Sequence, residues 1–138
     1  MGGGKAVSVL LDTHAWVWWT TRPDKLARAQ RSAIDRCLKD NDSVLMVSII
    51  SCWEVALLCQ KGKLRFTTPA EQWLQEASTV PGIEVVPLTL PIVSTAAQLS
   101  GLKDPADMLI VATAQHHRVR LVTNDSRIVE AKLVAIVA

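Results

Sequence analysis

The stretch Val7-Ser8-Val9-Leu10-Leu11-Asp12 joins a short apolar run to a carboxylate. Its length and its content of Val and Leu predict a buried β-strand. Similar runs follow at 44–47, 83–86 and 121–123, with a weaker one at 134–137, and helical patterns separate them. Strands that alternate with helices form a parallel sheet covered on both faces. We therefore expect one α/β domain whose parallel sheet has four or five strands flanked by helices.

Proline and glycine mark the expected helices between these strands. A short helix after residue 12 carries Trp16 and Trp19 on one face. Further helices are expected from Pro23 to about residue 42, from Ser48 or Ser51 to Gly62, from Pro69 onward, from Pro91 to Gly101 and from Pro105 to about His117. The helix from Pro23 carries apolar residues among its charges, and these are Leu26, Ala29, Ala33 and Leu38.

Length and composition limit the class of protein. A chain of 138 residues, 49% hydrophobic and 20% charged, is typical of a single globular domain. The net charge of +2 neither indicates nor excludes a nucleic-acid partner. Three cysteines without a Cys-x-x-Cys pair argue against a disulfide framework and fit a reducing cytoplasm. No stretch resembles a secretory signal or approaches the ~20 apolar residues of a membrane span.

Four carboxylates lie in or beside apolar runs, and they are Asp12, Glu54, Asp107 and Asp125. Each has an ordinary explanation by itself: a turn or helix cap for Asp12, an ion pair with a nearby cation for Glu54, a favourable helix dipole for Asp107 and an Asn-Asp turn for Asp125. An unpaired acid in an apolar setting is costly unless it is neutralised or binds a cation. Four such acids together predict one shared cation site.

The chemistry of these acids favours a hard cation. Oxygen ligands select Mg²⁺ or Mn²⁺, and His14, His116 and His117 are poorly placed for zinc. Asp12 and Asp125 end strands, which is where ligand sites of open α/β sheets form. A cluster of acids that holds Mg²⁺ suits cleavage of a phosphodiester bond. We interpret Asp104, which precedes Pro105, as a structural turn residue.

The segments that carry these acids resemble the PIN-domain ribonucleases, and most closely the VapC-type toxins of toxin–antitoxin modules. The resemblance rests on Leu10-Leu11-Asp12-Thr13-His14, on residues 51–56 with 61–64, on residues 104–114 and on Leu121-Val122-Thr123-Asn124-Asp125. These segments span almost the whole chain. We therefore expect a flexible leader at residues 1–6 and one PIN-like nuclease domain at residues 7–138.

The resemblance implies an RNA endonuclease that depends on Mg²⁺ or Mn²⁺. The four carboxylates match the acidic tetrad of the family, and Thr13 and Thr123 match polar residues that support it. Relatives are commonly homodimers and are inhibited by a cognate antitoxin. One departure is Met108, because many relatives carry Arg directly after the third acid. The family resemblance thus leaves the contact to the substrate phosphate unassigned.

Other side chains are candidates for contact with RNA or a partner. The cations that could contact phosphates are Lys61, Lys63, Arg65, Arg118 and Arg120. Among the tryptophans, Trp16, Trp19, Trp53 and Trp73 have spacings typical of a core or an interface, and Trp18 is expected to be the most exposed. The apolar content of segment 15–38 suggests either ordinary core or a groove for an antitoxin peptide.

Two other functions compete with RNA cleavage. An aspartyl-phosphate phosphatase would also begin with a strand and an Asp, but it needs a second acid two residues later, where His14 stands. A PIN-like module that binds RNA or a partner without cutting would not need four acids. RNA cleavage with Mg²⁺ or Mn²⁺, compared with EDTA, distinguishes these alternatives.

Overall fold

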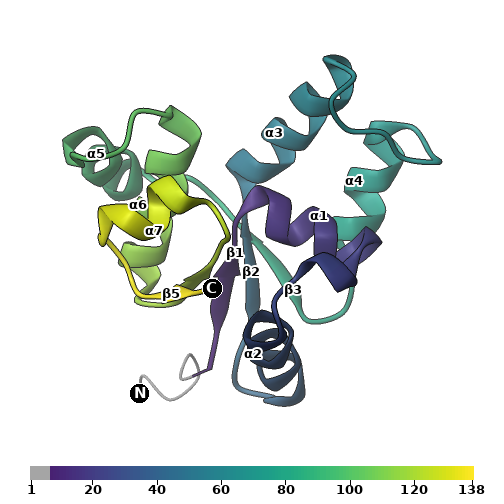
Figure 1. Cartoon of the computed structure of the whole chain (residues 1–138), viewed down its shortest axis with the longest axis horizontal. Coiled ribbons are helices and arrows are strands. Elements are labelled where there is room, and N and C mark those ends of the chain that lie inside the picture. Colours follow the sequence, from purple (N-terminus) through teal and green to yellow (C-terminus); the bar gives the residue numbers. More distant parts are fainter. Residues whose placement is uncertain (1–6) are drawn as a thin grey trace.

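A computed structural model of the chain describes residues 7–138, and the leader expected at residues 1–6 lies outside the described residues. Five parallel strands form one sheet in the order β3-β2-β1-β4-β5 (Figure 1). They are Val9–Leu11 (β1), Leu45–Ser48 (β2), Ile83–Val86 (β3), Arg120–Val122 (β4) and Ile136–Val137 (β5). The predicted α/β class and parallel sheet are confirmed, with strand ends within two residues of those expected.

The helices connect the strands in the manner that parallel pairing requires. They are α1 (Thr13–Thr21), the short 3₁₀ turn η2 (Pro23–Lys25), α2 (Arg28–Lys39), α3 (Ile49–Gln60), α4 (Ala70–Ser78), α5 (Leu90–Gln98), α6 (Pro105–His117) and α7 (Ser126–Ala131). None of the helices in residues 7–138 combines the length and hydropathy that a membrane crossing requires.

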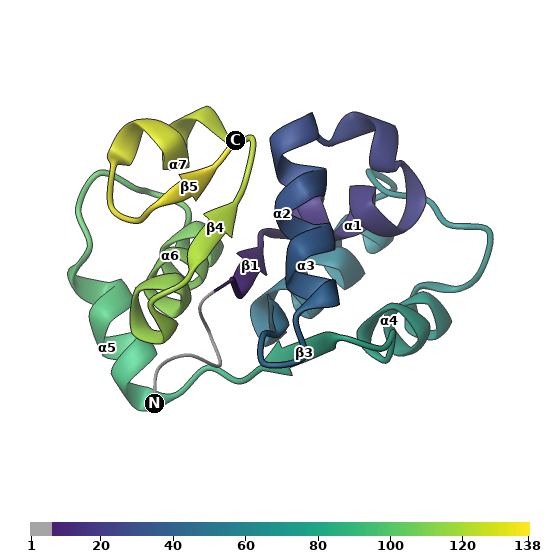
Figure 2. The ribbon, with the colours of Figure 1, turned by 90° about the horizontal axis from the view of Figure 1, so that it is seen from below.

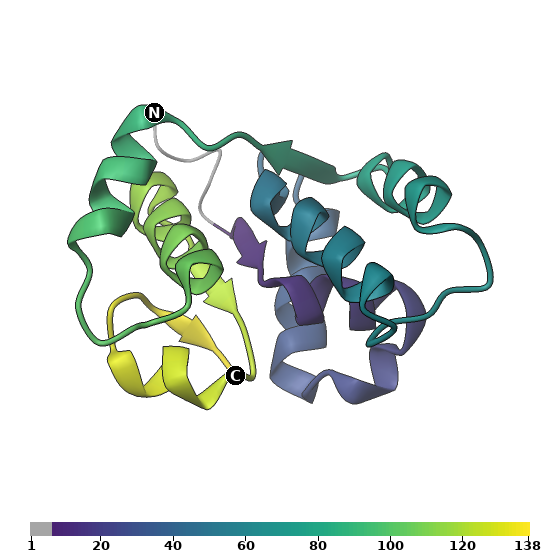
Figure 3. The ribbon, with the colours of Figure 1, turned by 90° about the horizontal axis from the view of Figure 1, so that it is seen from above.

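Alternate residues of the central strands point to opposite faces of the sheet. Val9 and Leu11 pack in a core cluster with side chains of α1, α2, α3 and α4. Leu10 belongs to a second cluster with side chains of α6 and α7, and α5 packs on α6 beyond it. Figures 2 and 3 show these two groups of helices on either side of the sheet. Burial on both faces explains why the strands are continuous apolar runs.

The helix expected from Pro23 begins later than predicted, and two of the four apolar residues expected in it, Leu26 and Ala33, are buried. The chain forms only η2 there, because Leu26 and Ala27 adopt extended backbone before α2 begins. This bend lets Leu26 enter the core with 3% of its surface exposed. The buried side of α2 then consists of Gln30, Ala33, Ile34 and Cys37, whereas Ala29 and Leu38 are exposed.

The expectation that Trp18 is the most exposed tryptophan is wrong, and of the two alternatives for Trp53 only an interface remains. Trp16 and Trp73 are buried as expected, and Trp19 is half-buried. Trp53, however, is 57% exposed, while Trp18 is half-buried. The apolar residues of segment 15–38 are largely core, since Trp16, Val17 and Leu26 are each at most 3% exposed. Those three side chains therefore cannot form a groove for a peptide.

Gln30 is a fully buried amide that joins α2 to the ends of two strands. Its Nε2 donates to the carbonyl oxygens of Thr123 at 3.2 Å and Val137 at 3.0 Å. Its Oε1 accepts from the backbone N–H of Ala27 at 2.9 Å. A single side chain thus satisfies backbone groups where β4 and β5 end, and one of them belongs to Thr123, two residues before Asp125.

Replacing Gln30 by Leu is expected to lower the free energy of unfolding by about 2 to 4 kcal/mol, because buried backbone groups lose their partners. Urea denaturation of the metal-free protein measures this change. Gln98→Leu, at an exposed position at the end of α5, is the matched control and should change stability by less than about 0.5 kcal/mol. Equal stabilities of the two variants would contradict the assigned role of Gln30.

Candidate functional site

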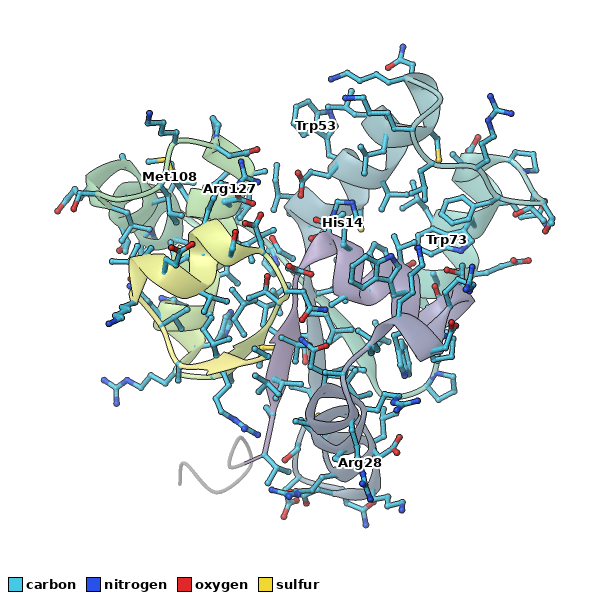
Figure 4. The ribbon with its side chains drawn as sticks, in the orientation of Figure 1. His14, Arg28, Trp53, Trp73, Met108 and Arg127 are labelled. Atoms are coloured by element: carbon cyan, nitrogen blue, oxygen red, sulfur yellow. The ribbon has the colours of Figure 1, made fainter. Side chains whose placement is uncertain are left out.

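An acidic cleft lies at the carboxyl ends of β1 and β4. The two strands are neighbours in the sheet. After β1 the chain continues to β2 on one side, and after β4 it continues to β5 on the other, so the cleft occupies a topological switch point. The cleft has a volume of about 480 Å³. It is lined by all four predicted acids and by Thr13, His14, Trp18, Leu58, Asp104, Ile110, Asn124 and Arg127. In Figure 4, His14 lies between the two groups of helices that form its walls.

Asp12 is the most buried of the four acids, with 8% of its surface exposed. It caps α1, and its Oδ1 accepts from the backbone N–H of Ala15 at 2.8 Å. Burial raises the pKa of Asp12, and a hydrogen bond from the Thr123 hydroxyl opposes part of that rise. The Thr123 hydroxyl oxygen also accepts from the backbone N–H of Asp125 at 3.0 Å. Thr123 therefore connects two of the acids.

Glu54 projects from α3 into the same cleft and is held by Thr13. The Thr13 hydroxyl donates to Glu54 Oε1, and the hydroxyl oxygens of Thr13 and Ser51 lie 2.9 Å apart in a second hydrogen bond. Ser48, not Ser51, caps α3. Burial raises the pKa of Glu54, and the nearby charge of Asp104 adds to this effect. No ion pair in residues 7–138 joins Glu54 to a lysine or arginine.

Asp104 and Asp107 stand together at the start of α6. Asp104 Oδ1 accepts from the backbone N–H groups of Ala106 at 2.8 Å and Asp107 at 3.4 Å, so Asp104 is the N-cap of α6. Asp104 nevertheless also lines the cleft. Burial, followed by the charges of Asp104 and Asp125, raises the pKa of Asp107 to about 7. Burial and like charge together therefore disfavour ionisation of this carboxyl.

Arg127 also lines the cleft, although the sequence analysis did not identify it as a candidate. Its Nε and Nη2 donate to the two carboxylate oxygens of Asp125 at 3.1 and 2.8 Å, and its Nη2 lies 3.8 Å from Asp107 Oδ2. The hydrogen bond from Arg127 keeps the pKa of Asp125 below its usual value. Arg127 is on α7, a six-residue helix missed in the sequence because its pattern is too short to be periodic. Met108 is absent from the cleft lining and packs against α5 and the second core cluster.

The predicted RNA-contacting cations lie in different places. Lys61 and Lys63 line a second groove of about 380 Å³ beside the acidic cleft. Arg65 lines a separate hollow with Trp73. Arg118 follows the other end of α6, roughly 20 Å along the helix axis from Asp104 at 1.5 Å per residue. Arg120 begins β4, at the end of the strand opposite the cleft. The structure thus brings two of the five candidate cations close to the acids.

The acids share one cleft but are not drawn together. Within residues 7–138, no three side chains of His, Cys, Asp or Glu are already gathered as a metal-binding group. Like charges repel, and neutral or cationic partners hold two of the acids apart, since Glu54 bonds to Thr13 and Asp125 bonds to Arg127. The donors that line the cleft are chiefly carboxylate and hydroxyl oxygens, which suit a hard cation.

Asp107→Asn is expected to stabilise the metal-free protein at pH 8. Below the unfolded pKa of about 4, both states keep the proton and Asp107 has no effect on stability. As pH rises toward the folded pKa of about 7, the unfolded state releases the proton first, so the folded state loses stability, and the loss is complete above that pKa. Asparagine abolishes this loss, and the melting temperature in EDTA should rise by about 5 °C or more at pH 8.

The difference in melting temperature between Asp107→Asn and the wild type should become smaller as the pH falls from 8 to about 4.5. Thermal melting of both proteins over this pH range measures it. Glu71→Gln, at an exposed position on α4 outside the cleft, is the matched control and should leave the melting temperature unchanged. A melting temperature of Asp107→Asn equal to that of the wild type at pH 8 would show that the ionised Asp107 carboxylate does not destabilise the fold.

Comparison with known proteins agrees with this architecture. Residues 9–133 match the PIN domain family. Ribonuclease VapC22 of Mycobacterium tuberculosis is 37% identical over 123 residues, which cover 88% of this chain and 89% of that protein. The fold is similar to VapBC2 of Rickettsia felis, solved with a promoter DNA fragment (TM-score 0.67, 15% identity, 94% and 96% of the two chains). It is also similar to a toxin–antitoxin complex from Klebsiella pneumoniae (TM-score 0.57, 18% identity, 86% and 87%). The chain belongs to the PIN-domain family and, within it, is a relative of the VapC ribonucleases.

Proposed function

We propose that the chain is a Mg²⁺- or Mn²⁺-dependent endoribonuclease and the toxin of a toxin–antitoxin pair. The observation that carries the proposal is the convergence of Asp12, Glu54, Asp107 and Asp125 on one cleft. The 37% identity to a protein named as a ribonuclease supports RNA as the substrate, and the fold shared with a toxin–antitoxin complex supports an antitoxin partner.

The four acids, supported by Thr13 and Thr123, are the groups that would hold the cation. They fit it because they provide oxygen donors in a partly buried cleft, where burial and mutual repulsion raise the pKa values of Asp12, Glu54 and Asp107. When bound, the cation would neutralise the scissile phosphate and lower the pKa of an attacking water.

The neighbouring side chains orient the acids for this task. The hydroxyls of Thr13 and Ser51 fix Glu54, and Thr123 fixes Asp12. Arg127 has a different part, because its side chain is 69% exposed and bound to Asp125. If Asp125 were bound to a cation, the Arg127 guanidinium would be available to contact a substrate phosphate, which is the contact that Met108 does not provide.

The partners in this proposal are RNA, a cognate antitoxin and a second copy of the chain. An apolar hollow of about 220 Å³ between α5 and α6 supports the homodimer, because Val93, which lines it, is 43% exposed and Leu90, one turn earlier on α5, is 81% exposed. Its lining consists of Val93, Ala96, Ala97, Pro105, Met108 and Leu109. A substrate of RNA and three cysteines that form no disulfide fit a cytoplasmic protein.

Asp12→Asn is expected to lower kcat/KM for RNA cleavage by about 100-fold or more, since one ligand of the cation is lost. The fold should persist, because asparagine also caps helices. Cleavage of total RNA by the wild type should require Mg²⁺ or Mn²⁺ and stop in EDTA.

Asp24→Asn, an exposed carboxylate outside the cleft, is the matched control and should cleave normally. Normal cleavage by Asp12→Asn would refute the assignment of the site. A wild-type protein that binds RNA but never cleaves it with Mn²⁺ would indicate the non-catalytic PIN-like module instead.

Arg127→Met is expected to have two opposite effects. Mn²⁺ should bind more tightly, because a competing cation leaves Asp125, while kcat/KM should fall by about tenfold with the loss of the phosphate contact. Isothermal titration with Mn²⁺ and RNA cleavage assays measure these effects. Arg36→Met, at an exposed position on α2, should change neither. Unchanged Mn²⁺ affinity in Arg127→Met would show that the guanidinium does not compete for the acids.

A further inference from the structure

Trp53 is the one exposed tryptophan of the chain. It is 57% exposed, whereas the other four are buried or half-buried. An indole in water forgoes hydrophobic stabilisation of about 25 cal/mol per Å² of apolar surface. Trp53 also directly precedes Glu54, one of the four cleft acids, and its position on α3 beside the cleft is visible in Figure 4.

The Trp53 groove, defined as the second groove lined by Lys61 and Lys63, continues the acidic cleft. Both are lined by Glu54, Leu58 and Asp104, so the two hollows lie side by side. Trp53 and Leu57 of α3 form one side of the Trp53 groove, and Pro105 and Ala106 of α6 form the other. A nucleic-acid strand whose phosphate lies at the acids would therefore pass next to the indole.

The charges of the Trp53 groove favour a polyanion. Lys61 and Lys63 are exposed, and no ion pair in the described part of the chain involves either. The helix dipole accounts for a cation at Lys61, at the end of α3. It does not account for an exposed indole in the same groove as two lysine side chains. Glu54 and Asp104 also line the groove, at the end where it joins the cleft and where the proposed cation would offset their charge.

We propose that the Trp53 groove is a subsite for a single-stranded nucleotide next to the scissile phosphate. The inference rests on the proposed ribonuclease function and deepens it. The indole of Trp53 stacks on the base, and Lys61 and Lys63 contact the phosphates that follow. Stacking tolerates any base, because every base has a π face, and phosphate contacts position the strand without reading its sequence. Trp53 is thus a positioning residue that favours unpaired RNA.

Binding and cleavage of a single-stranded RNA 12-mer that contains 2-aminopurine test this subsite. Trp53→Ala should weaken binding by about tenfold and raise KM more than it lowers kcat, and it should remove the stacking-dependent quenching of the 2-aminopurine. Trp53→Phe should retain most of the affinity. Removing Lys61 and Lys63 together should reduce the salt dependence of binding by about 1.4 in log–log slope, at 0.7 per phosphate contact.

Ile49→Ala is the matched control, because Ile49 is an exposed apolar residue one turn earlier on α3 and does not line the groove. It should bind and cleave the 12-mer normally. Thermal melting checks the fold, and Trp53→Ala should melt like the wild type, since the side chain is mostly exposed.

Three outcomes would overturn the subsite: unchanged affinity of Trp53→Ala for the 12-mer, a dimer that dissociates in Trp53→Ala with RNA affinity intact, or loss of antitoxin binding alone. The last two would assign Trp53 to a protein interface. Trp53-dependent binding without cleavage by any variant would refute the proposed nuclease function but support the subsite. Cleavage by the wild type together with unchanged RNA affinity of Trp53→Ala would support the proposed nuclease function but refute the subsite.

Discussion

The cost of holding ionised carboxylates close together in a partly buried cleft is the constraint on which the site depends, and burial contributes more to it than mutual repulsion. Each acid is relieved by a different neighbour: Asp12 by Thr123 and its own helix cap, Glu54 by Thr13, and Asp125 by Arg127. Asp107 has the weakest relief, since Arg127 is 3.8 Å away and Asp104 adds a like charge. The local structure therefore keeps the acids ionisable and apart, with one carboxyl that titrates near neutral pH.

The parallel sheet makes this arrangement possible. Because all five strands run the same way, the acids that follow β1 and β4 meet at one edge. Three helices also begin there, since Asp12, Asp104 and Asp125 are the N-caps of α1, α6 and α7. Helix N-termini carry partial positive charge, so the fold offsets some of the repulsion before any cation binds. Gln30 supports the same edge from α2 by satisfying the carbonyl groups of Thr123 and Val137.

Two kinds of feature could be predicted from the sequence: elements with a repeating apolar pattern, and charged residues in apolar surroundings, where burial costs energy. Apolar runs bounded by acids and turns indicated the strands, and four anomalous carboxylates indicated the cleft that all of them line. The sequence could not predict the extended backbone at Leu26, because burial of that side chain in the core overrides the helical pattern. It could not predict α7 either, because six residues give no periodicity and Asp125 reads equally well as a turn.

The sequence did not show that Trp53 and Arg127 border the cleft, and the reason is the same for both. Spacing identifies the side of a helix that faces the core, but it does not show which exposed side chains border a cleft built from distant segments. Trp53 comes from α3 and Arg127 from α7, and Figure 4 shows them on opposite sides of the cleft. In the proposed function the acids hold the cation, while Arg127 and the Trp53 groove position the RNA on either side of it. Chemistry and positioning then depend on different residues, so substrate preference can change at Trp53 or Arg127 without loss of the acids that bind the cation.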